Sequence, residues 1–185
     1  KICDNYGINY YLVDPLNPEK SYGLNPFIYD DPAKIAITIS SVIHGITTVD
    51  GPEMKDSSKE EIYIQILENL SILLKVVYPK MHDGVLPNME DLLVLLSKFD
   101  LVEKMTEILK ADPELSKKYQ MQISYFYRNF YNNSKGKANT ENYTYQLSSK
   151  IENLLRIPSI KAILCNRHIN INFDTALENG DFIFI

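Results

Sequence analysis

The stretch Ser57–Val77, SSKEEIYIQILENLSILLKVV, decides the fold class. Isoleucine, leucine and valine recur along it at helical spacing, and a second set widens this stripe until the segment is apolar on nearly every side. A helix of this kind is buried at the centre of a protein rather than at its surface. Ser57 with Glu60, and Ser58 with Glu61, match the capping-box pattern that begins helices. We therefore expect a bundle of helices around this segment.

Helix-start signals predict further helices on both sides of the central one. Asp31 precedes Pro32, and Asp112 precedes Pro113, which is the pattern of an N-cap followed by a first-turn proline. We expect the second of these helices to run to about Tyr131. Shorter helices or turns are expected after Asn88, after Asp100, around Leu147–Leu155, over Ser159–Leu164 and after Asp174.

Together these signals predict six or seven helices. The segments between them are rich in proline, glycine and polar residues, which is typical of turns. The expected loops and turns are Pro15–Tyr29, Thr47–Ser57 (a mobile loop), Pro79–Pro87 and Asn132–Asn142.

Two short β-prone runs flank the predicted helices. Tyr10–Val13 stops at an Asp-Pro step, and the run Phe182–Ile185 follows Gly180, which is expected to end the last helical turn. The second run is typical of a strand that is buried on both faces of a parallel sheet. Two distant short strands cannot make a stable sheet alone. We therefore expect an excised piece of a longer protein, in which a mainly α domain (31–165) is inserted into a larger α/β domain that contributes 1–30 and 166–185.

The composition is that of an ordinary globular domain. The 185 residues are 45% hydrophobic and 23% charged, and the net charge is −5. This excess of acid argues against binding nucleic acid with the whole surface, although a local basic patch is still compatible with it. No apolar run approaches the ~20 residues that span a bilayer. Two cysteines cannot form a disulfide framework, and the first residues lack the apolar core of a signal peptide, so the sequence predicts a cytoplasmic protein.

The sequence contains none of the common catalytic motifs. The only Gly-Lys step, Gly136-Lys137, lacks the upstream glycine and the following hydroxyl residue of a phosphate-binding loop. Cys165 and His168 could contribute to a zinc site with Cys3, His44 or His82, but the spacing matches no partner motif. We therefore assign no catalytic, cofactor-binding or metal-ligating residue.

One segment combines aromatic and basic side chains. Such a combination can stack on bases and hold phosphates. The alternative, which we favour, is that helical spacing places the aromatic rings in the core while the tyrosine hydroxyls remain in water. The candidate contacts for a partner or for DNA are Tyr125, Tyr127, Arg128, Tyr131, Lys135 and Lys137.

Several segments occur in an order that is similar to a known family. Tyr11–Pro15 ends in Asp-Pro, Tyr22–Phe27 contains Gly-Leu-Asn-Pro, and Pro87–Leu92 reads PNMEDL. Leu147–Leu164 contains Ile-Pro-Ser-Ile-Lys-Ala-Ile-Leu, and Phe173–Gly180 leads into the last strand. This order resembles the TraG/TrwB-like coupling ATPases of type IV secretion and conjugation, in the FtsK/HerA superfamily, over nearly the whole chain. Asn88 stands where the family has threonine, and Ile157 where it has asparagine.

The resemblance implies that this chain is the inserted all-α domain with flanking strands of a RecA-like core. Walker A would precede Lys1 and Walker B would follow Ile185, so the chain itself would be no enzyme and hold no cofactor, whereas the parent would bind ATP and Mg²⁺. The implied parent is hexameric and lies at the cytoplasmic face of the inner or cell membrane. The implied partners are a relaxase or relaxosome proteins, with DNA a weaker contact because the chain is acidic.

Three alternatives remain open at the level of sequence. The first is the helical domain of the related ATPase that energises the same secretion system. The second is a helical adaptor that stands alone, against which the apolar last strand argues. The third is a nucleic-acid module that uses the aromatic segment, whose affinity would fall steeply with salt.

Overall fold

The computed structural model describes residues 9–47, 57–132 and 134–185. The described chain is mainly α-helical, as predicted, with ten α-helices and one 3-10 helix between two short strands. The elements are β1 (Tyr10–Leu12), η1 (Pro26–Ile28), α2 (Pro32–Thr47), α3 (Ser57–Val76), α4 (Tyr78–Met81), α5 (Met89–Ser97), α6 (Phe99–Ala111), α7 (Pro113–Lys118), α8 (Gln120–Asn129), α9 (Lys137–Leu155), α10 (Pro158–Leu164), α11 (Phe173–Asn179) and β2 (Phe182–Phe184).

Helix α3 is the centre of the bundle, as its sequence predicted. It packs against α2, α5, α6 and α9. Its apolar side chains are buried over more than one face, which explains why the sequence lacks the polar stripe of a surface helix. The buried members are Ile66, Leu67, Leu70, Ile72, Leu73 and Leu74.

The two strands form a parallel pair. Tyr10 lies opposite Phe182, and Leu12 lies opposite Phe184. The backbone amide of Val13 extends the ladder by donating to the carbonyl of Phe184 at 2.8 Å. Parallel strands require a crossover connection, and here that connection contains every helix in the described part of the chain.

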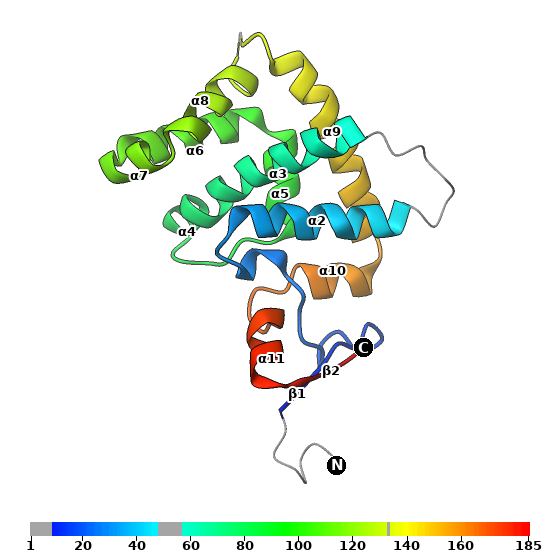
Figure 1. Cartoon of the computed structure of the whole chain (residues 1–185). Helices are drawn as coiled ribbons and strands as arrows, with labels where there is room; N and C mark the ends of the chain where they lie inside the picture. The colour runs from blue at the N-terminus through cyan, green and yellow to red at the C-terminus, as the bar shows by residue number, and fades with distance from the viewer. Residues whose placement is uncertain (1–8, 48–56, 133) are drawn as a thin grey trace.

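The strand pair and α11 lie together at one end of the molecule, below the other helices in Figure 1. They enclose a small core of their own, made by Val13, Ile163, Ile171 and Ala176. A much larger core occupies the bundle. The described chain therefore has a helical body and a small strand unit.

The predicted burial of the last strand on both faces is wrong for the described chain. Phe182 and Phe184 are about half exposed, at 50% and 47%. Only the opposite face of the pair, which carries Tyr11 and Ile183, packs on the small core. The reason is that no described element covers the face formed by Tyr10, Leu12, Phe182 and Phe184.

The number of helices is higher than the six or seven predicted, because proline and polar residues did not mark all the breaks. The helix expected from Pro113 to Tyr131 is divided at Tyr119, whose backbone angles (φ −110°, ψ 27°) are not helical. Part of the expected turn at Pro79–Pro87 is the short helix α4, which has its proline in the first turn, where no amide donor is needed. Part of the expected loop at Asn132–Asn142 belongs to α9.

Two predicted N-caps are displaced and three, at Asp31, Asn88 and Asp112, are confirmed. Helix α6 begins before Asp100, which lies in its first turn, and α11 is capped by Asn172 rather than by Asp174. Asp31 accepts from the amide of Ala33 at 3.0 Å, and Asn88 caps α5. The expected loop at Thr47–Ser57 and the cap side chains of Ser57 and Ser58 lie outside the described residues.

Candidate functional site

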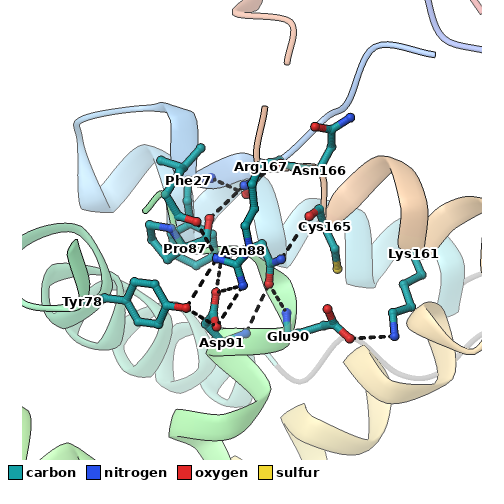
Figure 2. Close-up of polar contacts among 12 residues, drawn as sticks. Phe27, Tyr78, Pro87, Asn88, Glu90, Asp91, Lys161, Cys165, Asn166 and Arg167 are labelled. Atoms are coloured by element: carbon teal, nitrogen blue, oxygen red, sulfur yellow. Dashed lines mark hydrogen bonds and ion pairs between the residues drawn. The ribbon is translucent and has the colours of Figure 1, made fainter. Parts of the chain in front are cut away.

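A cluster of polar side chains lies where the helical body meets the strand unit. We call Asn25, Tyr78, Asn88, Asp91 and Arg167 the junction cluster. Figure 2 shows most of it: Arg167 reaches from the segment after α10 toward Tyr78 and Asp91, and Asn88 lies between Asp91 and Cys165. Its members come from the loop before η1, from α4, from the start of α5 and from the segment after α10.

Asn25 joins three segments that are far apart in the sequence. It is 1% exposed. Its side-chain amide donates to the carbonyl oxygens of Pro87 at 2.8 Å and of Asn166 at 3.0 Å, and its Oδ1 accepts from the amide of Phe27. Its own backbone amide donates to Oδ1 of Asn170. Because a buried polar group that loses its partner is costly, these bonds fix the three segments relative to one another.

The neighbouring Gly23 allows the close approach that these bonds require. Its backbone pairs with the segment around Asn170 through the amide of Ile171 and the carbonyl of Ile169. A Cβ at this position would lie 2.4 Å from Cβ of Asn166. A side chain here would therefore force the two segments apart.

Asn88 has two roles at the start of α5. Its Oδ1 accepts from the amides of Glu90 and Asp91, and Asp91 accepts from the amide of Asn88, which completes a capping box. Its side-chain amide donates to the carbonyl of Cys165 at the end of α10, at 3.0 Å. Only a side chain with both an acceptor and a donor can cap one helix and bind another in this way.

Asp91 and Arg167 form the charged part of the junction cluster. Nη2 of Arg167 lies 3.0 Å from Oδ2 of Asp91, and Nη1 donates to the carbonyl of Leu86. Tyr78 donates to Asp91 at 2.8 Å. Burial, followed by the bond to Asp91, raises the pKa of Tyr78, so this hydroxyl remains a donor at neutral pH. The ionisable side chains of Tyr78, Asp91 and Arg167 are all bonded to one another. The cluster therefore offers no free acid or base, and its role is to hold segments together.

Two ion pairs flank this cluster. Lys161 of α10 lies 2.6 Å from Glu90 of α5 (Figure 2), and Lys34 of α2 pairs with Asp174 of α11. Both pairs are partly exposed, so each contributes little to stability. They nevertheless follow the same boundary between the body and the strand unit.

The free face of the strand pair carries four exposed apolar or aromatic side chains. We call Tyr10, Leu12, Phe182 and Phe184 the strand-pair face. The rings of Phe182 and Phe184 are stacked with their centroids 6.2 Å apart. The ring of Tyr10 is edge-on to that of Phe184, with 6.0 Å between the centroids. Apolar groups gathered in this way on a surface mark a contact site.

The structure does not bring the six candidate contacts into one surface. Tyr125 is buried, at 8% exposure, and lines a hollow together with the exposed Arg128. Lys135 is exposed. The ammonium group of Lys137 donates a hydrogen bond to Oδ1 of Asn132 and lies 3.8 Å from Oε1 of Glu141.

Tyr127 and Tyr131 face α6 instead. Both hydroxyls donate to Oε1 of Glu107, at 2.5 and 2.7 Å, and Lys110 donates to the hydroxyl of Tyr127. These bonds lower the pKa of Glu107, and burial, followed by the bond to Glu107, raises that of Tyr131. The two tyrosines therefore join α8 and the segment that follows it to α6 rather than presenting free rings with wet hydroxyls.

The cysteine and histidine side chains form no metal centre in the described part of the chain. No group of three or more His, Cys, Asp or Glu residues is placed to hold an ion there. Burial, followed by the charge of Glu90, raises the pKa of Cys165 to about 11, so its thiol is protonated at neutral pH and is a poor nucleophile. Cys3 lies outside the described residues.

Sequence reasoning missed most of the junction cluster. Asn88 was identified as a helix start, and Asn25 only as part of the expected loop Pro15–Tyr29. The pairing of Arg167 with Asp91 carried no signal, because an ion pair between residues 76 positions apart leaves no local pattern. The available signal was the position of Asn25 and Asn88 beside a proline and a helix start, where an asparagine side chain commonly bonds to backbone.

Comparisons with known proteins give no relative. No protein family, curated protein or solved structure matches this chain. Among the described residues, none of the helices combines the length and the apolar character that crossing a bilayer requires.

Proposed function

We propose that this chain is the cytoplasmic all-α domain of a conjugative DNA-transfer coupling ATPase of the TraG/TrwB-like kind. In this role it recognises the relaxase–DNA complex, or another protein substrate, for type IV secretion. ATP and Mg²⁺ belong to the RecA-like core of the parent protein, which is a hexamer at the membrane. The segment itself carries out no catalysis.

The observation that carries this proposal is the parallel pairing of β1 with β2. Tyr11 lies opposite Ile183, and all the helices of the described residues lie between them in the sequence. An insertion between two strands of an existing parallel sheet produces this topology, because the inserted body leaves and re-enters the sheet at neighbouring positions. A helical adaptor that stands alone does not require its first and last strands to pair in parallel.

The strand-pair face gives a second line of support. Parallel sheets are covered on both faces in nearly all known cases, and a two-stranded sheet is marginal alone. Here one face packs on the small core while Phe182 and Phe184 remain half exposed. Further strands and helices of a motor core would cover this face.

The junction cluster suits the transmission of motion from such a core to the helices. Asn25, Asn88 and Arg167 bind the segments next to the strands to the start of α5. Movement of the strand unit during ATP hydrolysis would therefore be passed to α5 rather than absorbed by a loose linker. This connects the motor to the helical body that meets the substrate.

Binding to the relaxase tests the proposed function. The chain is immobilised, and the relaxase encoded by the same genetic element is titrated with and without its DNA in biolayer interferometry. We expect saturable binding that depends on the relaxase and persists at moderate salt. Binding to DNA alone, with affinity that falls steeply with salt, or no binding to either would contradict the proposal.

A matched control separates the two faces of the molecule. Phe182→Thr with Phe184→Thr alters only the strand-pair face, which the proposal assigns to the parent core. This variant should bind the relaxase as the unchanged chain does. Loss of binding in it would place the substrate on the strands and contradict the assignment of recognition to the helices.

A further inference from the structure

A hollow of about 260 Å³ lies between α3, α8 and the start of α9, away from the junction cluster. Its described lining contains one charged residue, Arg128, and no carboxylate. The other polar side chains that line it carry hydroxyl or amide groups and include Gln65, Tyr125, Asn139 and Tyr143.

Tyr125 has a buried ring, and its hydroxyl has no protein partner among the described residues. The side chain is 8% exposed, and its hydroxyl makes no hydrogen bond to another described residue; because that oxygen is not among the fully buried polar atoms that lack a partner, it is open to solvent in the hollow. Burial raises the pKa of Tyr125 to about 12, although the charge of Arg128 acts in the opposite direction. The hydroxyl is therefore a protonated donor that faces a cationic neighbour, and an anion would satisfy both.

Arg128 forms no ion pair with any described carboxylate, whereas nearby basic side chains do. Lys137 is paired with Glu141, and Lys110 with Glu107. In a chain of net charge −5, an exposed guanidinium without an acidic partner beside a polar hollow is a ready contact for an oxyanion, which its planar fork matches.

The turn before α9 fixes the position of Arg128. The amide of Gly136 donates to the carbonyl of Arg128 at 3.2 Å, and a Cβ at Gly136 would lie 2.5 Å from Oδ1 of Asn129. This close approach holds the end of α8 against the start of α9. Arg128 and Asn139 are thereby brought to the same hollow from two helices.

We propose that this hollow binds a compact oxyanion, a phosphate or a carboxylate group, between the guanidinium of Arg128 and the hydroxyl of Tyr125. The side-chain amides of Gln65 and Asn139 provide further donors. This binding site is independent of the proposed function in secretion.

A second hollow on α9 provides an internal contrast. It measures about 490 Å³ and is lined by Glu141 and Glu152 as well as by Arg156 and Tyr145. Two carboxylates oppose the binding of an anion there. Arg156→Gln and Tyr145→Phe are therefore matched controls for Arg128→Gln and Tyr125→Phe.

The test is a titration of the ¹⁵N-labelled full chain by NMR at constant ionic strength. Inorganic phosphate, acetate and chloride are added in separate arms, and the side-chain resonances of Arg128, Gln65 and Asn139 are followed. We expect saturable shifts with phosphate or acetate, and the stronger of the two identifies the group that the site takes. Shifts that do not saturate, or that are as large with chloride, would overturn the proposal.

The variants decide whether the named side chains make the site. Arg128→Gln should weaken binding about tenfold or more, because a charged hydrogen bond is lost. Tyr125→Phe should weaken binding several-fold while leaving the melting temperature of the anion-free chain about equal, since its hydroxyl has no protein partner to lose among the described residues. Unchanged affinity in both, or equal losses in Arg156→Gln and Tyr145→Phe, would overturn the proposal.

Discussion

The side-chain amide of Asn88 donates to the carbonyl of Cys165 across 3.0 Å and 77 positions of sequence. The oxygen of the same side chain caps α5. One residue thus begins a helix of the body and holds the segment that leads back to the strands.

Substitutions at Asn88 should separate these two roles. Asn88→Thr keeps an oxygen for the cap and loses the bond to Cys165, so we expect a loss of about 1 kcal/mol in the free energy of unfolding. Asn88→Ala loses both, and we expect about 2 kcal/mol or more. Urea denaturation measures both values. If Asn88→Thr were as stable as the unchanged chain, the bond across the junction would contribute nothing.

The ion pair between Asp91 and Arg167 should be coupled more strongly than a surface pair. Their side chains are 15% and 27% exposed, and the pair shares Tyr78. A double-mutant cycle with Asp91→Asn and Arg167→Met should give a coupling free energy of about 1.5–3 kcal/mol.

The control for this cycle is Lys80 with Asp112, whose side chains are 51% and 37% exposed. We expect a coupling free energy of about 0–1 kcal/mol there. Equal coupling free energies would show that the pair of Asp91 and Arg167 is no stronger than an ion pair on the surface.

The bonds from Tyr127 and Tyr131 make Glu107 a source of acid sensitivity. They lower the pKa of Glu107 in the folded chain. A carboxyl with a lowered folded pKa stabilises the protein fully above its unfolded pKa, and this contribution is lost as pH falls through the folded value. Tyr127→Phe with Tyr131→Phe should therefore raise the pKa of Glu107 toward its ordinary value and reduce the loss of stability on acidification.

The side-chain carboxyl signal of Glu107 in ¹³C NMR reports this pKa directly, and urea midpoints at neutral and acidic pH report the stability. Tyr145→Phe on an exposed tyrosine is the control and should change neither quantity. An unchanged Glu107 titration in the double variant would mean that the two hydroxyls do not hold its carboxylate in solution.

The strand-pair face should be dispensable for the stability of this segment. Phe182→Thr with Phe184→Thr keeps the preference for strand and removes half-exposed rings, so we expect a change within about 1 kcal/mol. Ile183 lies on the opposite face and packs against the small core. Ile183→Thr should therefore reduce the free energy of unfolding by more. Thermal unfolding compares the two. A larger loss from the phenylalanine pair would mean that this face is already part of the core.

The sequence predicted the features of this fold that are set locally. The all-round apolar pattern of Ser57–Val77 identified the central helix, and Asn88 was recognised as a cap because its partners are two and three residues away. The break at Tyr119 was missed because no proline or glycine marks it. The cap at Asn172 was attributed to Asp174, since either residue type fits the pattern and only the backbone decides between them.

The candidate sites were less accessible to sequence reasoning. Asn25 bonds to Pro87 across 62 positions, and a single sequence contains no record of such a contact. The aromatic segment was recognised as one group, whereas the helical turn of α8 directs Tyr127 toward Glu107 and Tyr125 toward a hollow. Spacing along a helix fixes which residues share a face, but not what that face meets.

We propose above all that β1 and β2 belong to the sheet of a motor core, and the coding sequence on either side of this segment in its source gene tests this most directly. The account predicts a Walker A phosphate-binding loop upstream of Lys1 and a strand ending in the acidic Walker B residues downstream of Ile185. A start codon directly before Lys1 together with a stop codon directly after Ile185 would contradict it.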